Sequence, residues 1–221
     1  MPLGNDPHKR YDAVLFDLDG TLTDSGPGIM HSAVFAFNAL GLPVPSEPVL
    51  RSFVGPPLAV AFRRAGVQEE LIEDAIRYYR DYYARKGKFE NTPYPGIEAL
   101  LERLSSEGFR LFVATSKPEA LSVEILEHFD LARRFELIAG ATFDHSRENK
   151  QDVLAYLFDQ AAGTEKAVLI GDTEFDAAGA AAAGIDCIGV SWGYGIVENM
   201  KKSGAKAIAD TPEKLYDLLH S

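Results

Sequence analysis

Four aspartates in two short stretches of the sequence have the types and spacing for chemistry that depends on a cation. Asp17 and Asp19 follow one apolar run, and Asp172 and Asp176 follow another. Each run predicts a buried strand, alternation places Asp17 and Asp19 on one side, and Asp176 lies one helical turn beyond Asp172. Gathered carboxylates repel each other unless a cation binds or one is protonated. We therefore expect a hard cation with oxygen ligands, magnesium before calcium if phosphate is the partner. For the first pair, a strand that ends in a polar turn is the simpler alternative.

Two other segments carry groups that could hold a phosphate. Thr115, Ser116 and Lys117 end an apolar run and start an expected helix, where free N–H groups and the helix dipole attract anions. Lys150 lies near the beginning of a later helix, where a cation is unfavourable to the dipole and so indicates an anionic partner. The ordinary alternatives are a helix N-cap for Thr115 and a solvated surface lysine for Lys150.

The elements that must position these residues alternate between strand and helix over most of the chain. Strands separated by single helices predict an α/β fold with a doubly wound parallel sheet. Ligands of such sheets bind at the carboxyl ends of the strands, beside a topological switch point, which is where the aspartates and Thr115 lie. Strands are expected over 13–16, 110–115, 137–141, 167–171, 187–191 and 207–208, and helices over 96–107, 117–128, 149–162, 175–183 and 212–219.

A purely helical stretch interrupts this alternation after the first pair of aspartates. It predicts an inserted helical bundle over 25–93, which leaves 11–24 and 94–221 for the α/β domain. The run of Ala and Gly over 177–184 indicates close packing between a helix and the sheet, with no chemical role. Within the insertion, helices are expected over 29–40, 47–54, 58–65 and 69–86.

Composition limits the partners. The chain has 221 residues, 46% of them hydrophobic, which is enough for a sizeable core. The net charge of −11 argues against a nucleic-acid polymer or an anionic membrane, yet a small phosphorylated substrate is compatible, since a bound divalent cation can reverse the local field. The single Cys187 excludes an intrachain disulfide and fits a reducing, cytoplasmic compartment. Residues 1–10 are expected to be a flexible tail rather than a signal peptide or membrane anchor.

The chemical motifs, taken in order, resemble those of the haloacid dehalogenase superfamily of phosphohydrolases. The matching pieces are FDLDGTL at Asp17, Thr115 with Ser116, Lys150, and GDTEFD at Asp172. The resemblance covers essentially the whole chain beyond the tail and implies a Rossmann-like core. The helical insertion resembles the small helical cap of phosphoglycolate phosphatases and their relatives.

The resemblance implies a role for each matching residue. Asp17 would be the nucleophile that forms an aspartyl-phosphate, and Asp19 the general acid toward the leaving oxygen and then the base toward water. Magnesium would be held by the Asp17 carboxylate, the Asp19 main-chain oxygen and Asp172. The phosphate ligands would be Thr115, Ser116, Lys150 and Gly20, with Asp176 and Lys117 in support.

In the insertion, the segment with Arg51, Phe53 and Gly55 resembles the loop of such caps that sets substrate specificity. A rigid Gly-Pro-Pro turn would aim Arg51 or Phe53 inward. The alternative places Phe53 in the core of the insertion and Arg51 in solvent. The fourth motif departs from the commoner phosphatase pattern, with Thr173 and Phe175 where relatives often place a basic residue or His.

We therefore predict a magnesium-dependent phosphatase for a small phosphorylated metabolite, similar to phosphoglycolate phosphatase and acting as a monomer or homodimer. The enzymatic alternatives are a 5'-nucleotidase or pyrophosphatase, and then a mutase similar to β-phosphoglucomutase. The alternative from another class is a phosphate-binding regulatory module. The combination of Asp17, Asp19, Lys150 and Asp172 argues against the module, because binding does not require a nucleophile and an acid as a pair.

Overall fold

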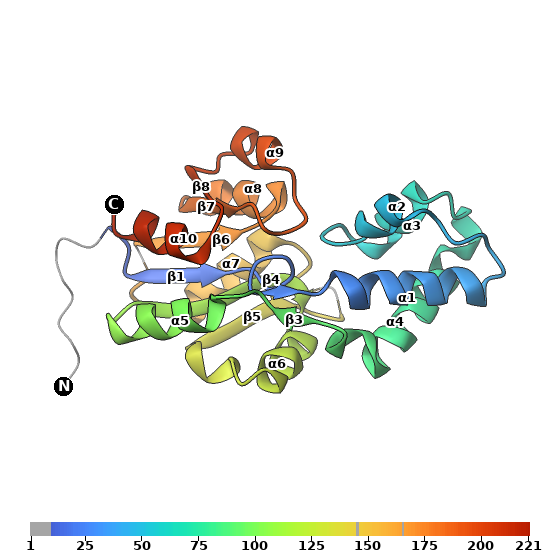
Figure 1. Cartoon of the computed structure of the whole chain (residues 1–221), viewed down its shortest axis with the longest axis horizontal. Helices are drawn as coiled ribbons and strands as arrows, with labels where there is room; N and C mark the ends of the chain where they lie inside the picture. The colour runs from blue at the N-terminus through green and yellow to red at the C-terminus, as the bar shows by residue number, and fades with distance from the viewer. Residues whose placement is uncertain (1–9, 145, 165) are drawn as a thin grey trace. The chain divides into compact units, whose positions relative to one another are not determined.

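The computed structural model describes residues 10–144, 146–164 and 166–221 (Figure 1), so nearly all of the expected tail lies outside the described residues. The chain divides into two compact units. The α/β unit runs to Leu22 and resumes over Pro93–Ser221, and the helical unit comprises Thr23–Thr92. None of the described helices has the length and apolar character needed to cross a membrane.

The α/β unit is built on a six-stranded sheet in the order β5-β4-β1-β6-β7-β8. All neighbouring strands are parallel, and Ala13 of β1 pairs with both Arg110 and Ala167, so β1 lies inside the sheet. This arrangement confirms the predicted α/β fold. The strands are β1 (Ala13–Phe16), β4 (Arg110–Pro118), β5 (Leu137–Ala141), β6 (Ala167–Gly171), β7 (Asp186–Val190) and β8 (Ala207–Ala209).

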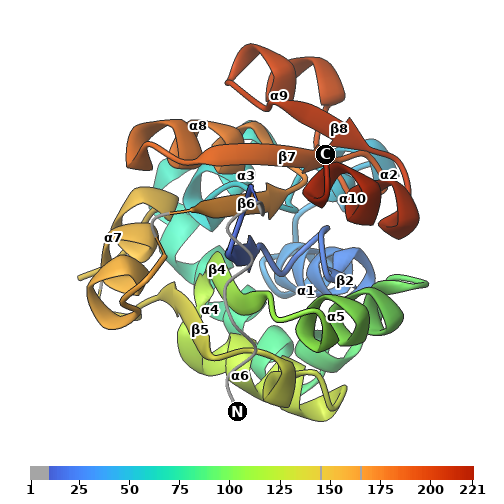
Figure 2. The same cartoon turned by 90° about the vertical axis from the view of Figure 1, so that its left-hand side faces the viewer.

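Helices cover both faces of this sheet. Val14 and Phe16 of β1 belong to one buried cluster, with α5, α6 and α10, while Ala13 and Leu15 belong to another, with α7 and α8. The split follows from alternation along the strand, and Figure 2 shows α7 and α8 on the opposite side of the sheet from α5 and α10. The helices are α5 (Ile97–Ser106), α6 (Glu119–His128), α7 (Lys150–Gln160), α8 (Glu174–Ala183), α9 (Val197–Lys202) and α10 (Pro212–Leu219), with a 3₁₀ turn at η3 (Ala132–Arg134).

The helical unit packs around aromatic side chains. Phe53 and Phe62 meet edge to face with ring centroids 5.0 Å apart, and the rings of Tyr79 and Tyr83 stack at 5.8 Å. The helices are α1 (Gly26–Ala39), α2 (Glu47–Arg51), α3 (Leu58–Arg64) and α4 (Ile72–Arg85), with 3₁₀ turns η1 (Glu69–Leu71) and η2 (Gly87–Phe89). At the ends of the insertion, β2 (Thr23–Asp24) pairs with β3 (Thr92–Pro93).

The sequence prediction was wrong at the end of β4. A helix was expected from Lys117, but the strand continues to Pro118 and α6 begins at Glu119. The reason is local: a residue before proline clashes with the proline ring in the helical conformation, which keeps Lys117 extended. A register shift between Thr115 and Pro118 accommodates the change. The short helix α9 was not predicted at all.

Candidate active site

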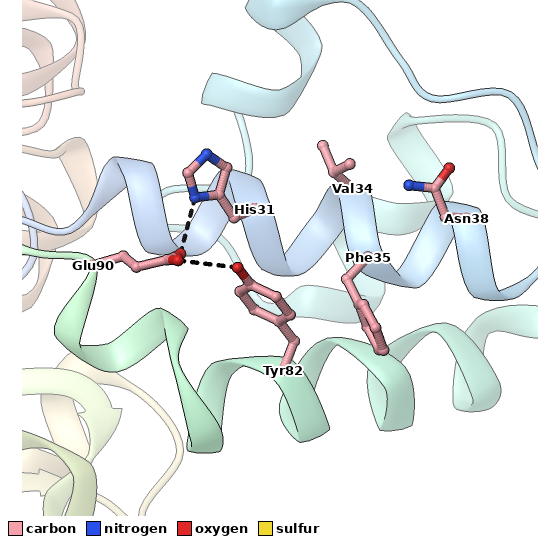
Figure 3. A pocket seen from close by; sticks show the side chains of 6 residues that line it. All are labelled: His31, Val34, Phe35, Asn38, Tyr82 and Glu90. Carbon is pink, nitrogen blue, oxygen red and sulfur yellow. Dashed lines mark hydrogen bonds and ion pairs between the residues drawn. The ribbon is translucent and has the colours of Figure 1, made fainter.

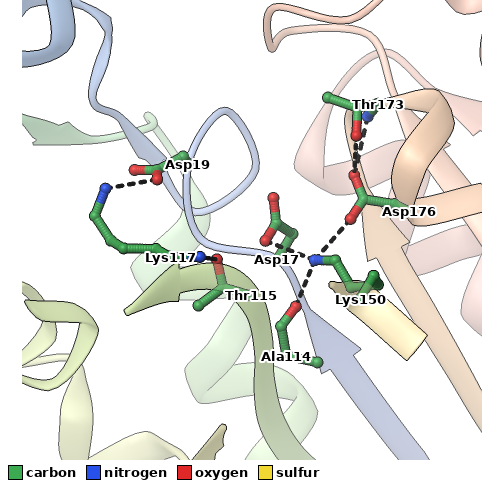
Figure 4. A network of polar contacts seen from close by, with 8 residues as sticks. All are labelled: Asp17, Asp19, Ala114, Thr115, Lys117, Lys150, Thr173 and Asp176. Carbon is green, nitrogen blue, oxygen red and sulfur yellow. Dashed lines mark hydrogen bonds and ion pairs between the residues drawn. The ribbon is translucent and has the colours of Figure 1, made fainter. Parts of the chain in front are cut away.

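Asp17 comes directly after β1, at the carboxyl end of the sheet, and is only 8% exposed. Its Oδ1 accepts a hydrogen bond from Lys150 Nζ at 2.8 Å (Figure 4). The same ammonium donates to the Ala114 carbonyl at 2.7 Å and lies 2.8 Å from Asp176 Oδ1. Three oxygens therefore match the three N–H donors of Lys150.

The position of Lys150 depends on the N-terminus of α7 and on a glycine of α8, Gly179. It is the first residue of α7, whose N-cap Asn149 accepts hydrogen bonds from the amides of Gln151 and Asp152. A Cβ at Gly179 of α8 would lie 2.6 Å from Lys150 Cγ. The glycine in this Ala-rich helix thus makes room for the lysine stem, a role beyond the sheet packing expected from the sequence.

The two later aspartates have different environments. Asp176 Oδ2 accepts from Thr173 N at 3.0 Å and Thr173 Oγ1 at 2.7 Å, which caps α8, while its Oδ1 faces Lys150. Asp172 is fully buried, and its Oδ2 accepts from the amides of Tyr194 at 2.7 Å and Gly195 at 3.3 Å. Its Oδ1 is buried with no hydrogen-bond partner among the described residues. Asp172, rather than Asp176, therefore has an oxygen available for a ligand.

These carboxylates fit a divalent cation. Asp17, Asp172 and Asp176 each offer one oxygen within 4.8 Å of the others. A buried carboxylate oxygen without a hydrogen-bond donor is unfavourable unless it binds a cation. Oxygen ligands suit magnesium. Asp172 Oδ1 meets that description, and Asp17 offers an oxygen within 4.8 Å of one of the Asp172 oxygens. That Asp17 and Asp172 hold the ion stays a prediction. The expected ligation by the main-chain oxygen of Asp19 stays a prediction.

Burial and neighbouring charges shift the pKa values of Asp17, Asp172 and Lys150. Burial raises the pKa of Asp17 to about 6, with the Lys150 ammonium opposing the rise and Asp176 adding to it. Burial also raises the pKa of Asp172 well above its usual range, and the charges of Asp176 and Asp17 contribute. Although burial alone lowers the pKa of Lys150, its two carboxylate partners raise it above the ordinary value. The lysine is therefore charged, and it supplies the positive charge next to Asp17.

The Asp19 carboxylate forms an ion pair with a second lysine, Lys117. Lys117 Nζ donates to Asp19 Oδ2 at 2.6 Å, and both side chains are largely buried. Asp19 Oδ1 is also buried without a partner in the described part of the chain. The structure thus brings the predicted supporting residue Lys117 to the proposed acid/base.

The remaining predicted phosphate ligands lie in the C-terminal half of β4 and in the turn after β1. Thr115 is buried within β4, just before its register shift, and its Oγ1 accepts from Lys117 N at 3.2 Å, whereas Ser116 is exposed. Because α6 begins only at Glu119, these two residues do not form the expected helix N-terminus. Gly20 has a φ of +82°, and a Cβ there would lie 2.6 Å from Asp172 Cγ. Gly20 therefore allows the first motif to approach Asp172.

The candidate specificity residues belong to the helical unit. Phe53 is 2% exposed and packs against Phe37 and Phe62 in the core of this unit, which is the packing alternative named above. Arg51 ends α2 and is exposed, as is Gly55. The involvement of Arg51 and Gly55 in substrate selection stays a prediction.

The helical unit also contains a depression between α1 and α4 (Figure 3). At its polar end, Glu90 Oε2 lies 2.9 Å from His31 Nδ1, and Glu90 Oε1 accepts from the Tyr82 hydroxyl at 3.0 Å. Glu90 therefore already has a partner for each oxygen. The lining residues are His31, Val34, Phe35, Asn38, Tyr82 and Glu90.

Sequence reasoning missed the loop after β7. There the Tyr194 and Gly195 amides bind Asp172, and Trp192 Nε1 donates to the Thr21 carbonyl at 3.1 Å. This loop acts through backbone N–H groups and through glycines, which have no side chain. A search of the sequence for reactive side chains therefore does not find it. The available signal was two glycines, Gly193 and Gly195, in the loop that follows a parallel strand, at the edge where ligands bind.

Comparison with known proteins identifies the family. Residues 14–190 match the model of the haloacid dehalogenase-like hydrolases, and the chain belongs to this family. It is 42% identical over 216 residues to the tyrosine-protein kinase PtkA of Mycobacterium tuberculosis, covering 96% of this chain and 74% of the relative. It is 39% identical over 198 residues to a 5'-nucleotidase of Pseudomonas aeruginosa, covering 89% and 90%.

Other relatives are phosphatases by name. A phosphoglycolate phosphatase of Pseudomonas savastanoi is 32% identical over 218 residues, covering 94% of this chain and 79% of the relative. The solved structure of a predicted phosphatase from Clostridium acetobutylicum superposes with a TM-score of 0.88 at 44% identity, covering 95% of this chain and 98% of that one. These relatives confirm the predicted family resemblance and the predicted enzyme class, a phosphatase of this family.

Proposed function

We propose that this chain is a magnesium-dependent phosphatase that hydrolyses a small phosphomonoester through an aspartyl-phosphate on Asp17. The observation that carries the proposal is the environment of Asp17. Lys150 donates to one of its oxygens at 2.8 Å, and Asp172, which has a buried oxygen that no described residue binds, offers an oxygen within 4.8 Å of Asp17. A fixed carboxylate beside a cation site is suited to covalent catalysis by displacement at phosphorus.

Hydrolysis then takes place in two displacements. In the first, an oxygen of Asp17 attacks the phosphorus, the ester bond to the leaving oxygen breaks, and Asp19 gives that oxygen a proton. In the second, Asp19 takes a proton from water, the water oxygen attacks the phosphorus, and the bond to Asp17 breaks with release of phosphate. Each residue ends in its starting state.

Several groups would stabilise the charge that moves during these steps. Magnesium, held by Asp17, Asp172 and the main-chain oxygen of Asp19, would neutralise charge on the phosphoryl oxygens. The charged Lys150 supplies a second positive group, and Lys117 orients Asp19 through their 2.6 Å contact. The phosphate itself would be bound by Thr115, Ser116, Lys150 and Gly20.

The proposal extends to the organisation of the protein. The α/β unit carries the reacting groups, and the helical unit acts as a cap that selects the substrate, with Arg51 and Gly55 as candidates for contact. The preferred substrate is a small metabolite such as phosphoglycolate, and the enzyme would act in the cytoplasm as a monomer or homodimer. The many acidic side chains, with a net charge of −11, support a small substrate over a nucleic-acid polymer.

A 5'-nucleotidase is the second candidate. The 39% identity to a 5'-nucleotidase, over 90% of that protein, favours it. A nucleoside 5'-monophosphate is also a phosphomonoester, so the same residues would perform the same two displacements. The two candidates differ only in the group that the helical unit must accommodate.

Phosphate release from a panel of compounds tests both candidates. The panel contains phosphoglycolate, nucleoside 5'-monophosphates, pyrophosphate, phosphotyrosine and hexose phosphates, each with magnesium and with chelator. We expect turnover that needs magnesium, is concentrated on one compound, and is lost in Asp17→Asn but not in Asp217→Asn, an exposed control on α10. Conversion of hexose 1-phosphate to 6-phosphate would indicate the mutase, and binding without turnover would indicate the regulatory module.

A further inference from the structure

The loop of residues 191–196, which follows β7, approaches the metal site through its backbone. We propose that Gly193 and Gly195 are positioning residues that determine which oxygen of Asp172 is presented to the metal ion. The inference rests on the proposed function for the identity of that ion. It assigns a role to residues that lie outside the four motifs.

The first step of the argument is the pair of amides at Asp172. Both the Tyr194 and the Gly195 amide donate to the same oxygen, Oδ2, at 2.7 and 3.3 Å. The other oxygen, Oδ1, is buried with no partner in the described ranges. Two donors on one oxygen fix the rotation of the carboxylate, which leaves Oδ1 as the oxygen that is free of donors and available to the ion.

The second step is the space that this arrangement requires. A Cβ at Gly193 would lie 2.5 Å from Asp172 Cβ, and a Cβ at Gly195 would lie 2.8 Å from the Asp172 carbonyl carbon. Real Cβ atoms essentially never come that close. Neither glycine has a positive φ, so these positions need glycine for the close approach rather than for backbone conformation.

The third step is the attachment of the loop to the first motif. Trp192 Nε1 donates to the Thr21 carbonyl at 3.1 Å, and Gly193 lies against Gly20 as well as Asp172. The loop therefore contacts the segment that carries Asp17 and the segment that carries Asp172. Displacement of the loop would change the relation between the two proposed ligands.

Metal affinity of the full chain tests this role directly. Mn²⁺, which takes the same oxygen ligands, is titrated and the free ion is measured by its EPR signal, with Mg²⁺ as competitor. We expect Gly193→Ala and Gly195→Ala to weaken binding of both ions about tenfold or more, the usual effect of removing support behind a metal ligand. The control is Gly184→Ala, where a Cβ meets nothing within 4 Å and the φ of +73° gives backbone strain alone.

A double-variant cycle separates positioning from general destabilisation. If the glycine acts through Asp172, adding Gly195→Ala to Asp172→Asn weakens binding no further than Asp172→Asn alone. If the alanine variants do not fold, Trp192→Phe replaces them, with an expected weakening of about tenfold, the low end for lost support behind a metal ligand, from loss of the link to Thr21. Native affinity in the folded glycine variants, or in Trp192→Phe when it replaces them, would overturn the inference, and so would additive losses in the cycle. These results concern ion binding, so a wild-type protein without phosphatase activity would refute the proposed function separately.

Discussion

Lys150 and Asp17, 133 positions apart in the sequence, place Nζ and Oδ1 at 2.8 Å from each other in the interior of the α/β unit. The same ammonium lies 2.8 Å from Asp176 Oδ1. It therefore separates two buried carboxylates that would otherwise repel each other. One lysine both orients the proposed nucleophile and stabilises its ionised form.

Replacement of Lys150 by methionine is expected to destabilise the fold as well as to abolish activity. Loss of one partner leaves buried carboxylates without their cation, which costs about 3–5 kcal/mol. Urea unfolding followed by circular dichroism measures the change in the free energy of unfolding. The matched control is Lys201→Met, whose partner Glu198 is exposed, with an expected change below about 1 kcal/mol. An equal free energy of unfolding for Lys150→Met and wild type would show that the ion pairs of Lys150 do not stabilise the fold.

Gly179→Ala is expected to destabilise the protein, although alanine has a higher helix propensity than glycine. In an ordinary helix interior this change stabilises by roughly 1 kcal/mol. Here the new Cβ would lie 2.6 Å from Lys150 Cγ, near the fixed end of a side chain that three oxygens hold in place. We expect lower thermal stability and lower kcat together. A more stable variant with native kcat would contradict the contact between α8 and Lys150.

Asp172→Asn is expected to separate stability from metal binding. In the absence of an ion, burial disfavours the charged carboxylate, so the neutral amide should raise the melting temperature in chelator. The amides of Tyr194 and Gly195 can still donate to the Asn oxygen. Thermal unfolding with and without magnesium checks this: the ion should stabilise the wild type more than it stabilises the variant. Equal stabilisation of both proteins would exclude Asp172 as a ligand.

Tyr11 is expected to make stability depend on pH in the alkaline range. Burial, together with the hydrogen bond to Asp186 at 2.8 Å, raises the pKa of Tyr11 from 10.0 to about 12. The unfolded chain loses this proton first, so the contribution of Tyr11 is complete below pH 10 and is lost as the pH rises toward 12. Free energies of unfolding measured between pH 8 and 11.5 should fall less steeply in Tyr11→Phe. If the free energy of unfolding fell equally with pH in the two proteins, ionisation of Tyr11 would not be coupled to folding.

Much of the sheet could be predicted because its strands are buried on both faces. Their continuous apolar runs, each followed by a polar residue, suffice to place Asp17 and Asp172 at the carboxyl edge of the sheet. Lys150 could also be predicted, because a cation at the start of a helix needs an anionic partner. The anion expected was phosphate, and the structure adds the carboxylates of Asp17 and Asp176.

Other parts of the site depend on tertiary contacts that local patterns do not encode. Gly179 looked like ordinary close packing, since the lysine it accommodates lies on another helix. The amides of Tyr194 and Gly195 have no side-chain signature, and the partner of Asp19, Lys117, was expected on a helix rather than at the end of a strand. Phe53 shows the same limit, because only the packing of the helical unit places its ring in an aromatic core.

The most direct test of the central claim is to find the residue that carries the phosphoryl group. Asp19→Asn is mixed with p-nitrophenyl phosphate, whose leaving group needs no proton, so the first displacement proceeds while the water step lacks its base. Quenching and reduction with borohydride convert an aspartyl-phosphate to homoserine, which peptide mass spectrometry locates. The account predicts homoserine at position 17, and none in the Asp17→Asn protein. Release of p-nitrophenol with reduction at another residue, or with no reduction at any time point, would contradict it.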